Sequence, residues 1–135
     1  GCHFTTFNCF ELSNIEHRAK FKSKVDLLVA SEFNRDITYF SNIVESAARD
    51  IHCYVVQVND SSYGDSRVTQ PAKSDEKDLI KVKGGKNPTI LVDTIDFKSL
   101  REFQLKEYSG QKMMGGFKPT PPDFEKENIL NRMKK

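Results

Sequence analysis

The sequence has few of the features that mark specialised protein classes. It has no tryptophan, only 3 cysteines, and no apolar run long enough to span a membrane. Positive and negative charges nearly balance, since the formal net charge is +2 over 135 residues. The lysines are scattered among acidic residues, and this pattern excludes the strong basic footprint of a chain that binds nucleic acid by itself.

Signals for export and for metal binding are also missing. The first ten residues, "GCHFTTFNCF", have neither the basic start nor the apolar stretch of a secretory signal. Cys2, Cys9 and Cys53 show neither a disulfide framework nor zinc-ligand spacing. We therefore expect a cytoplasmic protein with free thiols, no metal, no cofactor and no membrane association. The sequence does not exclude one disulfide bond. His52 is expected to pack in the interior rather than to bind a metal.

The first half of the chain alternates between strand-like and helix-like patterns. β-formers alternate in "FTTFNCF", whereas apolar residues recur every three or four positions between residues 36 and 51. These patterns predict strands at 4–10, 25–31 and 53–59, and helices at 13–21 and 36–51.

The second half is richer in strands at first and in helices at its end. Gly84, Gly85, Asn87 and Pro88 predict a turn between two strands, which would form an antiparallel hairpin. A loop-like stretch with three glycines and three prolines occupies residues 109–122. The patterns predict strands at 66–71, 78–83 and 89–96, and helices at 97–108 and 123–135, the last one capped by Asp123.

This order of elements predicts a single α/β domain spanning residues 1–135. Its centre is expected to be a mixed β-sheet of about six strands, with helices packed on one face.

Several segments together resemble the second half of the nitrilase superfamily. "CFEL" (9–12) stands at the place of the family's motif of a cysteine nucleophile, an aromatic residue and an acid. Similar segments follow in the family's order: "VDLLVAS" (25–31), "AARDIHCYVVQVN" (47–59), "YGDSRVTQP" (63–71) and "ILVDTIDFKSLREF" (90–103). The resemblance implies half of an α-β-β-α sandwich, with its core at 4–107 and a C-terminal arm and helix at 108–135.

A narrower resemblance concerns residues 45–67, "ESAARDIHCYVVQVNDSSYGDSR". This segment is similar to the nitrilase-like region at the C-terminal end of some bacterial reverse transcriptases that act in phage defence. It implies that the parent protein is an RNA-directed DNA polymerase and that the chain is associated with nucleic acid only through that parent.

The resemblance implies a thiol mechanism for carbon–nitrogen bond hydrolysis. Cys9 matches the nucleophile, and the backbone N–H of Phe10 would be one oxyanion donor. The family's glutamate base and its lysine lie well upstream, and only eight residues precede Cys9 here. The chain is therefore expected to be a fragment that is inactive alone, to associate with the N-terminal part of its own parent, and to form a homodimer through exposed apolar sheet surface.

Several polar residues near the predicted strand ends are further candidates for the site. Glu32, Phe33 and Asn34 follow a predicted strand and would line a pocket, because ligands gather beyond the carboxyl ends of strands in open α/β sheets. Glu11 is either a group supporting Cys9 or a surface acid before a helix. Arg67 is expected to pair with Asp65 or Glu32 near solvent.

The family pattern is not complete, and this bears on function. Ala47 and Asp50 stand where the family commonly has an arginine and a glutamate. The sequence therefore supports either a hydrolase domain or a nitrilase-like regulatory or assembly module without catalysis. A free-standing thiol-dependent binding protein is a weaker third reading.

Overall fold

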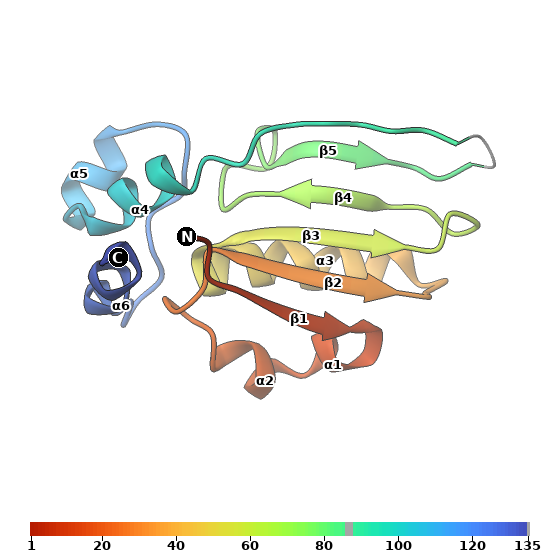
Figure 1. The fold of residues 1–135 in the computed structure, drawn as a ribbon, viewed down its shortest axis with the longest axis horizontal. Coiled ribbons are helices and arrows are strands. Elements are labelled where there is room, and N and C mark those ends of the chain that lie inside the picture. The colour runs from red at the N-terminus through yellow and green to blue at the C-terminus, as the bar shows by residue number, and fades with distance from the viewer. Residues whose placement is uncertain (86–87, 135) are drawn as a thin grey trace.

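The fold is built on one five-stranded sheet with the order β1-β2-β3-β4-β5 (Figure 1). The computed structural model describes residues 1–85 and 88–134. β1, β2 and β3 run parallel, and β4 and β5 continue the sheet antiparallel. The strands are β1 (Phe4–Asn8), β2 (Leu27–Glu32), β3 (Tyr54–Asn59), β4 (Ser66–Thr69) and β5 (Asp78–Val82). The predicted α/β class with a mixed sheet is confirmed.

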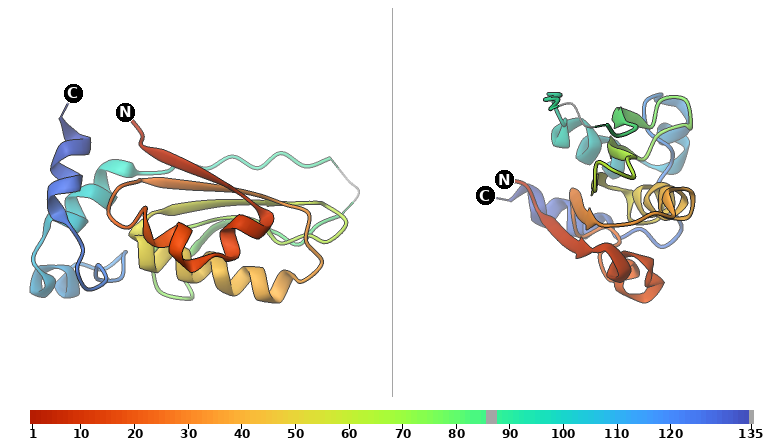
Figure 2. Two further views of the ribbon diagram at one scale, coloured as in Figure 1. Left: turned by 90° about the horizontal axis from the view of Figure 1, so that it is seen from below. Right: turned by 90° about the vertical axis from the view of Figure 1, so that its right-hand side faces the viewer.

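The helices fall into two groups. The first group covers one face of the sheet (Figure 2), and comprises α1 (Cys9–Ser13), α2 (Ile15–Ala19), α3 (Ile37–Ala47) and a π-helical turn, η1 (Ala48–His52). The second group packs at the end of the sheet where β2 and β3 begin (Figure 1), and comprises α4 (Phe97–Leu105), α5 (Tyr108–Met113) and α6 (Lys126–Met133). The opposite end of the sheet, where the parallel strands finish, is left clear of the second group.

The core lies between the sheet and α3. Leu28 and Val55 are fully buried on the helix-facing side of β2 and β3. The apolar stripe of α3 meets them with Phe40, Ile43 and Val44, as its three- and four-residue spacing predicts. Burial of this stripe supplies the main driving force for the helix-to-sheet packing.

The other face of the sheet carries a row of branched apolar side chains. Val29, Val56, Val68 and Ile80 are partners in register across four strands, and all four are half-buried. α1, α2 and α3 lie on the opposite side (Figure 2). We call these four residues the open face, because no helix among the described residues packs over them.

The predicted sixth strand at 89–96 is wrong. Residues 88–96 carry no strand, and Figure 2 shows that the segment stands off from β5 on the side of the sheet away from α1, α2 and α3. Ile90 is 90% exposed and Val92 is 89% exposed, so their side chains bury no surface that would hold the segment in a sheet. Part of the predicted turn, residues 86 and 87, lies outside the described residues.

The C-terminal third also departs from the expectation. The predicted loop at 109–122 contains most of α5, which buries Gln111. α6 begins at Lys126 with Glu125 as its N-cap, so Asp123 is not the cap. Asp123 has a positive φ of 57° instead, a left-handed conformation that Asp tolerates and that turns the chain before the helix.

A buried ion cluster joins the C-terminal helices to the start of β2. The carboxylate of Asp26 accepts hydrogen bonds from Arg101 Nε at 2.9 Å and from Arg132 Nη1 at 2.8 Å. It also accepts the backbone N–H of His3 at 2.9 Å. Burial raises the pKa of Asp26, but these hydrogen bonds and the two guanidinium charges outweigh burial and hold the pKa below its usual value.

His52 holds the C-terminal arm from the sheet side. Its ring is buried, lies 2.8 Å from the carbonyl of Lys118 through Nε2, and stacks on Phe103 with ring centroids 6.0 Å apart. Gln104 Nε2 lies 3.1 Å from its Nδ1. Burial lowers the pKa of His52 from 6.5 to about 4, because the charged ring would lose its hydration.

Stability should therefore fall as the pH falls from 6.5 to about 4. In that range the unfolded chain binds a proton at His52 that the folded chain excludes, so the contribution is complete above pH 6.5 and disappears towards pH 4. We expect His52 to account for up to about 3 kcal/mol of this loss. Urea unfolding at a series of pH values measures it.

The matched variants are His52→Asn and His17→Asn. Asn tolerates the left-handed φ of 61° at position 52 and removes the titrating ring. His17 is exposed on α2, so His17→Asn is the control for replacing a histidine outside the core. An unchanged slope in His52→Asn would contradict the assignment.

Candidate active site

Three parallel strands end side by side and form the carboxyl edge of the sheet. Asn8 pairs with Ser31 in register, and Glu32 pairs with Asn59. Ser31 Oγ donates to Asn8 Oδ1 at 3.1 Å across this edge. The edge therefore gathers polar side chains from strands that are far apart in the sequence, as open α/β sheets do at their ligand sites.

Cys9 lies at this edge, directly after the last residue of β1. It is the first residue of α1 and is half-buried against the core. Asn34 Nδ2 donates to its Sγ at 3.8 Å. Cys9 therefore lies at the end of its strand, within hydrogen-bond reach of the loop that follows β2.

The amide of Asn34 is oriented by a second contact. Its Oδ1 accepts the backbone N–H of Asp36 at 2.8 Å, which leaves Nδ2 to face Cys9. Asp36 in turn caps α3 by accepting the N–H of Tyr39 at 3.2 Å. The turn that starts α3 therefore fixes the only described hydrogen-bond donor to the thiol.

Asn59 clamps the loops around this site, and the sequence interpretation missed it. Its Oδ1 accepts the N–H of Asn34 at 2.9 Å, and its Nδ2 donates to the carbonyls of Asn34 and Gly64, both at 2.9 Å. Gly64 has φ 79°, and an added Cβ would lie 1.6 Å from the carbonyl oxygen of Lys83. An asparagine at the end of a predicted strand, at the same edge as Glu32, was the signal available in the sequence.

Glu32 is buried beneath the loop rather than open to a pocket. Its Oε2 accepts a hydrogen bond from Gln57 Nε2 at 2.8 Å. The other oxygen, Oε1, is buried without a hydrogen-bond partner in the described part of the chain. Burial raises the pKa of Glu32, against the opposing effects of the Gln57 hydrogen bond and the Arg67 charge.

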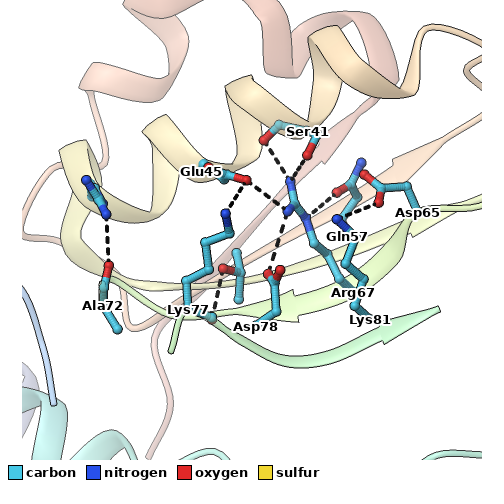
Figure 3. A network of polar contacts seen from close by, with 11 residues as sticks. Ser41, Glu45, Gln57, Asp65, Arg67, Ala72, Lys77, Asp78 and Lys81 are labelled. Carbon is cyan, nitrogen blue, oxygen red and sulfur yellow. Dashed lines mark hydrogen bonds and ion pairs between the residues drawn. The ribbon is translucent and has the colours of Figure 1, made fainter. Parts of the chain in front are cut away.

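Gln57 connects Glu32 to a buried arginine. Arg67 Nε donates to Gln57 Oε1 at 3.0 Å, and the Arg67 side chain is fully buried (Figure 3). Its Nη2 donates to the carbonyl of Ser41 at 2.7 Å, and Nη1 lies 3.3 Å from Glu45 Oε1 and 3.6 Å from Asp78 Oδ1. The guanidinium therefore links β3, β4 and β5 to α3.

The predicted partners of Arg67 are wrong. Asp65 pairs with Lys81 at 3.0 Å instead, and Glu32 reaches Arg67 only through Gln57. The reason is the alternation of β4, which turns Arg67 under α3, where Glu45 lies.

The remaining predicted site residues lie near Cys9 in sequence but differ in environment. Glu11 accepts the backbone N–H of Asn8 at 2.9 Å, so its carboxylate supports the start of α1. The N–H of Phe10 belongs to the first turn of α1, where backbone donors lack intrahelical acceptors, while its ring is 85% exposed. Phe33 is 72% exposed and packs edge-on against Tyr63.

This arrangement places one oriented amide donor on the thiol, which is less than thiol catalysis requires. A thiol needs a base to become reactive, and a tetrahedral intermediate needs fixed donors. Within residues 1–85 and 88–134, Sγ of Cys9 has hydrogen-bond contact only with the Asn34 amide. The described residues contain no cluster of three metal-ligating side chains, and none of their helices is both long and apolar enough to cross a bilayer.

The comparisons with known proteins give no relative from which residue roles could be transferred. No protein-family model matches the chain, and no curated protein sequence matches it either.

Asn59→Ala should destabilise the fold and loosen the Cys9 site. The change leaves the N–H and carbonyl of Asn34 and the carbonyl of Gly64 without their partner, at a cost of about 2 kcal/mol. Alkylation of Cys9 by iodoacetamide, followed by peptide mass spectrometry with Cys2 as internal reference, should become faster. Asn42→Ala, at an exposed position of α3, is the matched control. Equal alkylation rates in both variants would show that Asn59 does not position the site.

Proposed function

We propose that this chain is the C-terminal part of a nitrilase-like thiol carbon–nitrogen hydrolase domain. Its parent would be a cytoplasmic bacterial reverse transcriptase that acts in phage defence, as the resemblance of residues 45–67 suggests. The observation that carries the proposal is the position of Cys9, which begins α1 at the carboxyl edge with an oriented amide on its sulfur.

The proposed chemistry uses Cys9 to attack the carbonyl carbon of an amide or the carbon of a nitrile. With an amide, the carbonyl oxygen becomes an oxyanion that the Phe10 N–H can meet, and the amine leaves as an acyl-thioester forms on sulfur. Water then releases the acid and returns the thiol. The base that takes the thiol proton and the lysine that shares the oxyanion would come from the N-terminal part of the parent.

The open face supports the need for a further sheet or chain. Val29, Val56, Val68 and Ile80 form a contiguous half-exposed apolar row on a side without described helices. Such a face favours association, because burying it removes apolar surface from water. In the proposed α-β-β-α sandwich, the N-terminal part of the parent covers this face, and in its absence a second copy does.

A specific observation favours a second function, a non-catalytic regulatory or assembly module. Both acidic residues expected around Cys9 are engaged elsewhere: Glu11 supports α1 and Glu32 binds Gln57. If the parent also lacks the glutamate and the lysine upstream, the domain would keep the sandwich for binding alone.

The chain by itself should not hydrolyse amides or nitriles above the level of Cys9→Ala. Loss of one oxyanion donor alone costs about 100- to 1,000-fold in turnover, and the missing base adds to this deficit. A panel of simple amides and nitriles, assayed by release of ammonia or amine, measures it. Cys9-dependent turnover by the isolated chain would overturn the view that the site is incomplete.

The parent protein separates the two functions. Turnover by the full-length parent that disappears in Cys9→Ala, but not in Cys2→Ala, supports the hydrolase. A parent without turnover, and without the upstream glutamate and lysine, supports the module.

The isolated chain should self-associate through the open face. Val56→Lys places a charge at the centre of this row and should convert a dimer to a monomer at micromolar concentration, because an interface cannot bury an unpaired ammonium group cheaply. Static light scattering measures the mass of each form. Ser46→Lys adds the same charge at an exposed position of α3 and should leave the dimer intact. A wild-type monomer would contradict the prediction.

A further inference from the structure

A second concave site lies far from Cys9, between η1 and the C-terminal arm. The cavity has a volume of about 700 Å³. Its lining includes Arg49, Lys106, Tyr108, Lys118, Phe124 and Lys126. The volume falls in the range of sites that bind small molecules. Neither the proposed hydrolase chemistry nor the open face uses any of these residues.

Hydrogen bonds from two sides fix the wall that carries Lys118. The N–H of Lys118 donates to the carbonyl of Pro71 at 2.7 Å, and its own carbonyl lies 2.8 Å from His52 Nε2. Further along the arm, the N–H of Thr120 donates to Oε1 of the buried Gln111 at 2.9 Å. The arm is therefore held in place before any ligand arrives, which lowers the entropic cost of binding.

The lining carries an excess of positive charge. Lys126 is paired with Glu107 at 2.7 Å, and Arg49 is held by donating to the carbonyl of Ala72 at 3.1 Å. Among the residues that the structure describes, the ammonium groups of Lys106 and Lys118 take part in no ion pair. Without the Lys126–Glu107 pair, the lining contains three cationic side chains, Arg49, Lys106 and Lys118. It contains one carboxylate besides, that of Asp50.

Tyr108 lines the same cavity as these cations. Tyr108 is 59% exposed, and Lys112 Nζ lies 4.8 Å from its ring centroid. Phe124 and three proline residues add apolar surface to the lining. A planar ring can stack on Tyr108, while an anion attached to it meets Lys106 and Lys118.

We propose that this cavity binds an organic phosphate that carries a planar ring, of the size of a nucleoside monophosphate. The phosphate is held by Lys106, Lys118 and Arg49, and the ring lies against Tyr108. The ligand is either a free nucleotide or one unit of a single strand, because both present the same chemistry.

Calorimetric titration of the full chain with adenosine monophosphate tests the site. Adenosine and inorganic phosphate are the partial ligands, and each should bind at least about tenfold more weakly than the whole nucleotide. Affinity should also fall when sodium chloride is raised from about 50 to about 300 mM, because the contacts are charged. A short thymidine oligonucleotide that binds more tightly than thymidine monophosphate would assign the ligand to a strand, and weaker binding would assign it to a free nucleotide.

Variants separate this site from general attraction to a basic surface. The double variant Lys106→Gln and Lys118→Gln should weaken binding of adenosine monophosphate about tenfold or more. Tyr108→Ala should weaken the nucleotide but not inorganic phosphate. Lys98→Gln, at an 84% exposed position of α4 where the side chain forms an ion pair with Glu102, is the control for the loss of one surface charge. Circular dichroism checks that each variant is folded. No binding at millimolar nucleotide, or equal loss in Lys98→Gln, overturns the proposal.

Discussion

The buried guanidinium of Arg67 is the constraint on which the helix-facing side of the sheet depends. A charge without exposure to water costs several kcal/mol unless hydrogen bonds surround it. Arg67 meets this requirement with Gln57, the carbonyl of Ser41 and two carboxylates, so α3 must sit over β4 in one position. The ion network determines where α3 lies on the sheet. Burial of the apolar stripe of α3 supplies most of the favourable free energy of packing.

This constraint reaches the candidate site through Gln57. Gln57 is committed at Oε1 to Arg67, so its amide nitrogen faces Glu32 and holds that carboxylate in the interior. Above it, Asn59 ties the loop that orients Asn34 towards Cys9. The surroundings of the thiol are thus set by side chains from β3 and β4 that never touch it. An amide donor and a rigid loop suit a nucleophile, but they do not replace a base.

Local pattern was sufficient where local chemistry decides the structure. The alternation of residues 4–10 and the edge rule for parallel strands place Cys9 next to the 31–34 segment, and the spacing in 36–51 gives α3 with η1. Prediction from the sequence was wrong where a residue far away in the chain determines the local structure. The 89–96 segment has a strand pattern but no surface to bury, and Arg67 selects Glu45, an acid on another element, over the nearby Asp65. Asn59 could have been predicted as a site residue from the sequence, because it ends a strand at the same edge as Glu32.

The cluster around Asp26 sets an order for assembly during synthesis. Asp26 and Arg132 are separated by 106 positions, so this ion pair closes a loop that contains nearly the whole sheet. While the chain emerges from the ribosome, Asp26 can be buried only in part, since one of its two cations does not yet exist. The sheet and α3 can form earlier from contacts much closer in sequence. Until residue 132 has left the exit tunnel, the end of the sheet at which β2 begins lacks the arginine that completes the cluster.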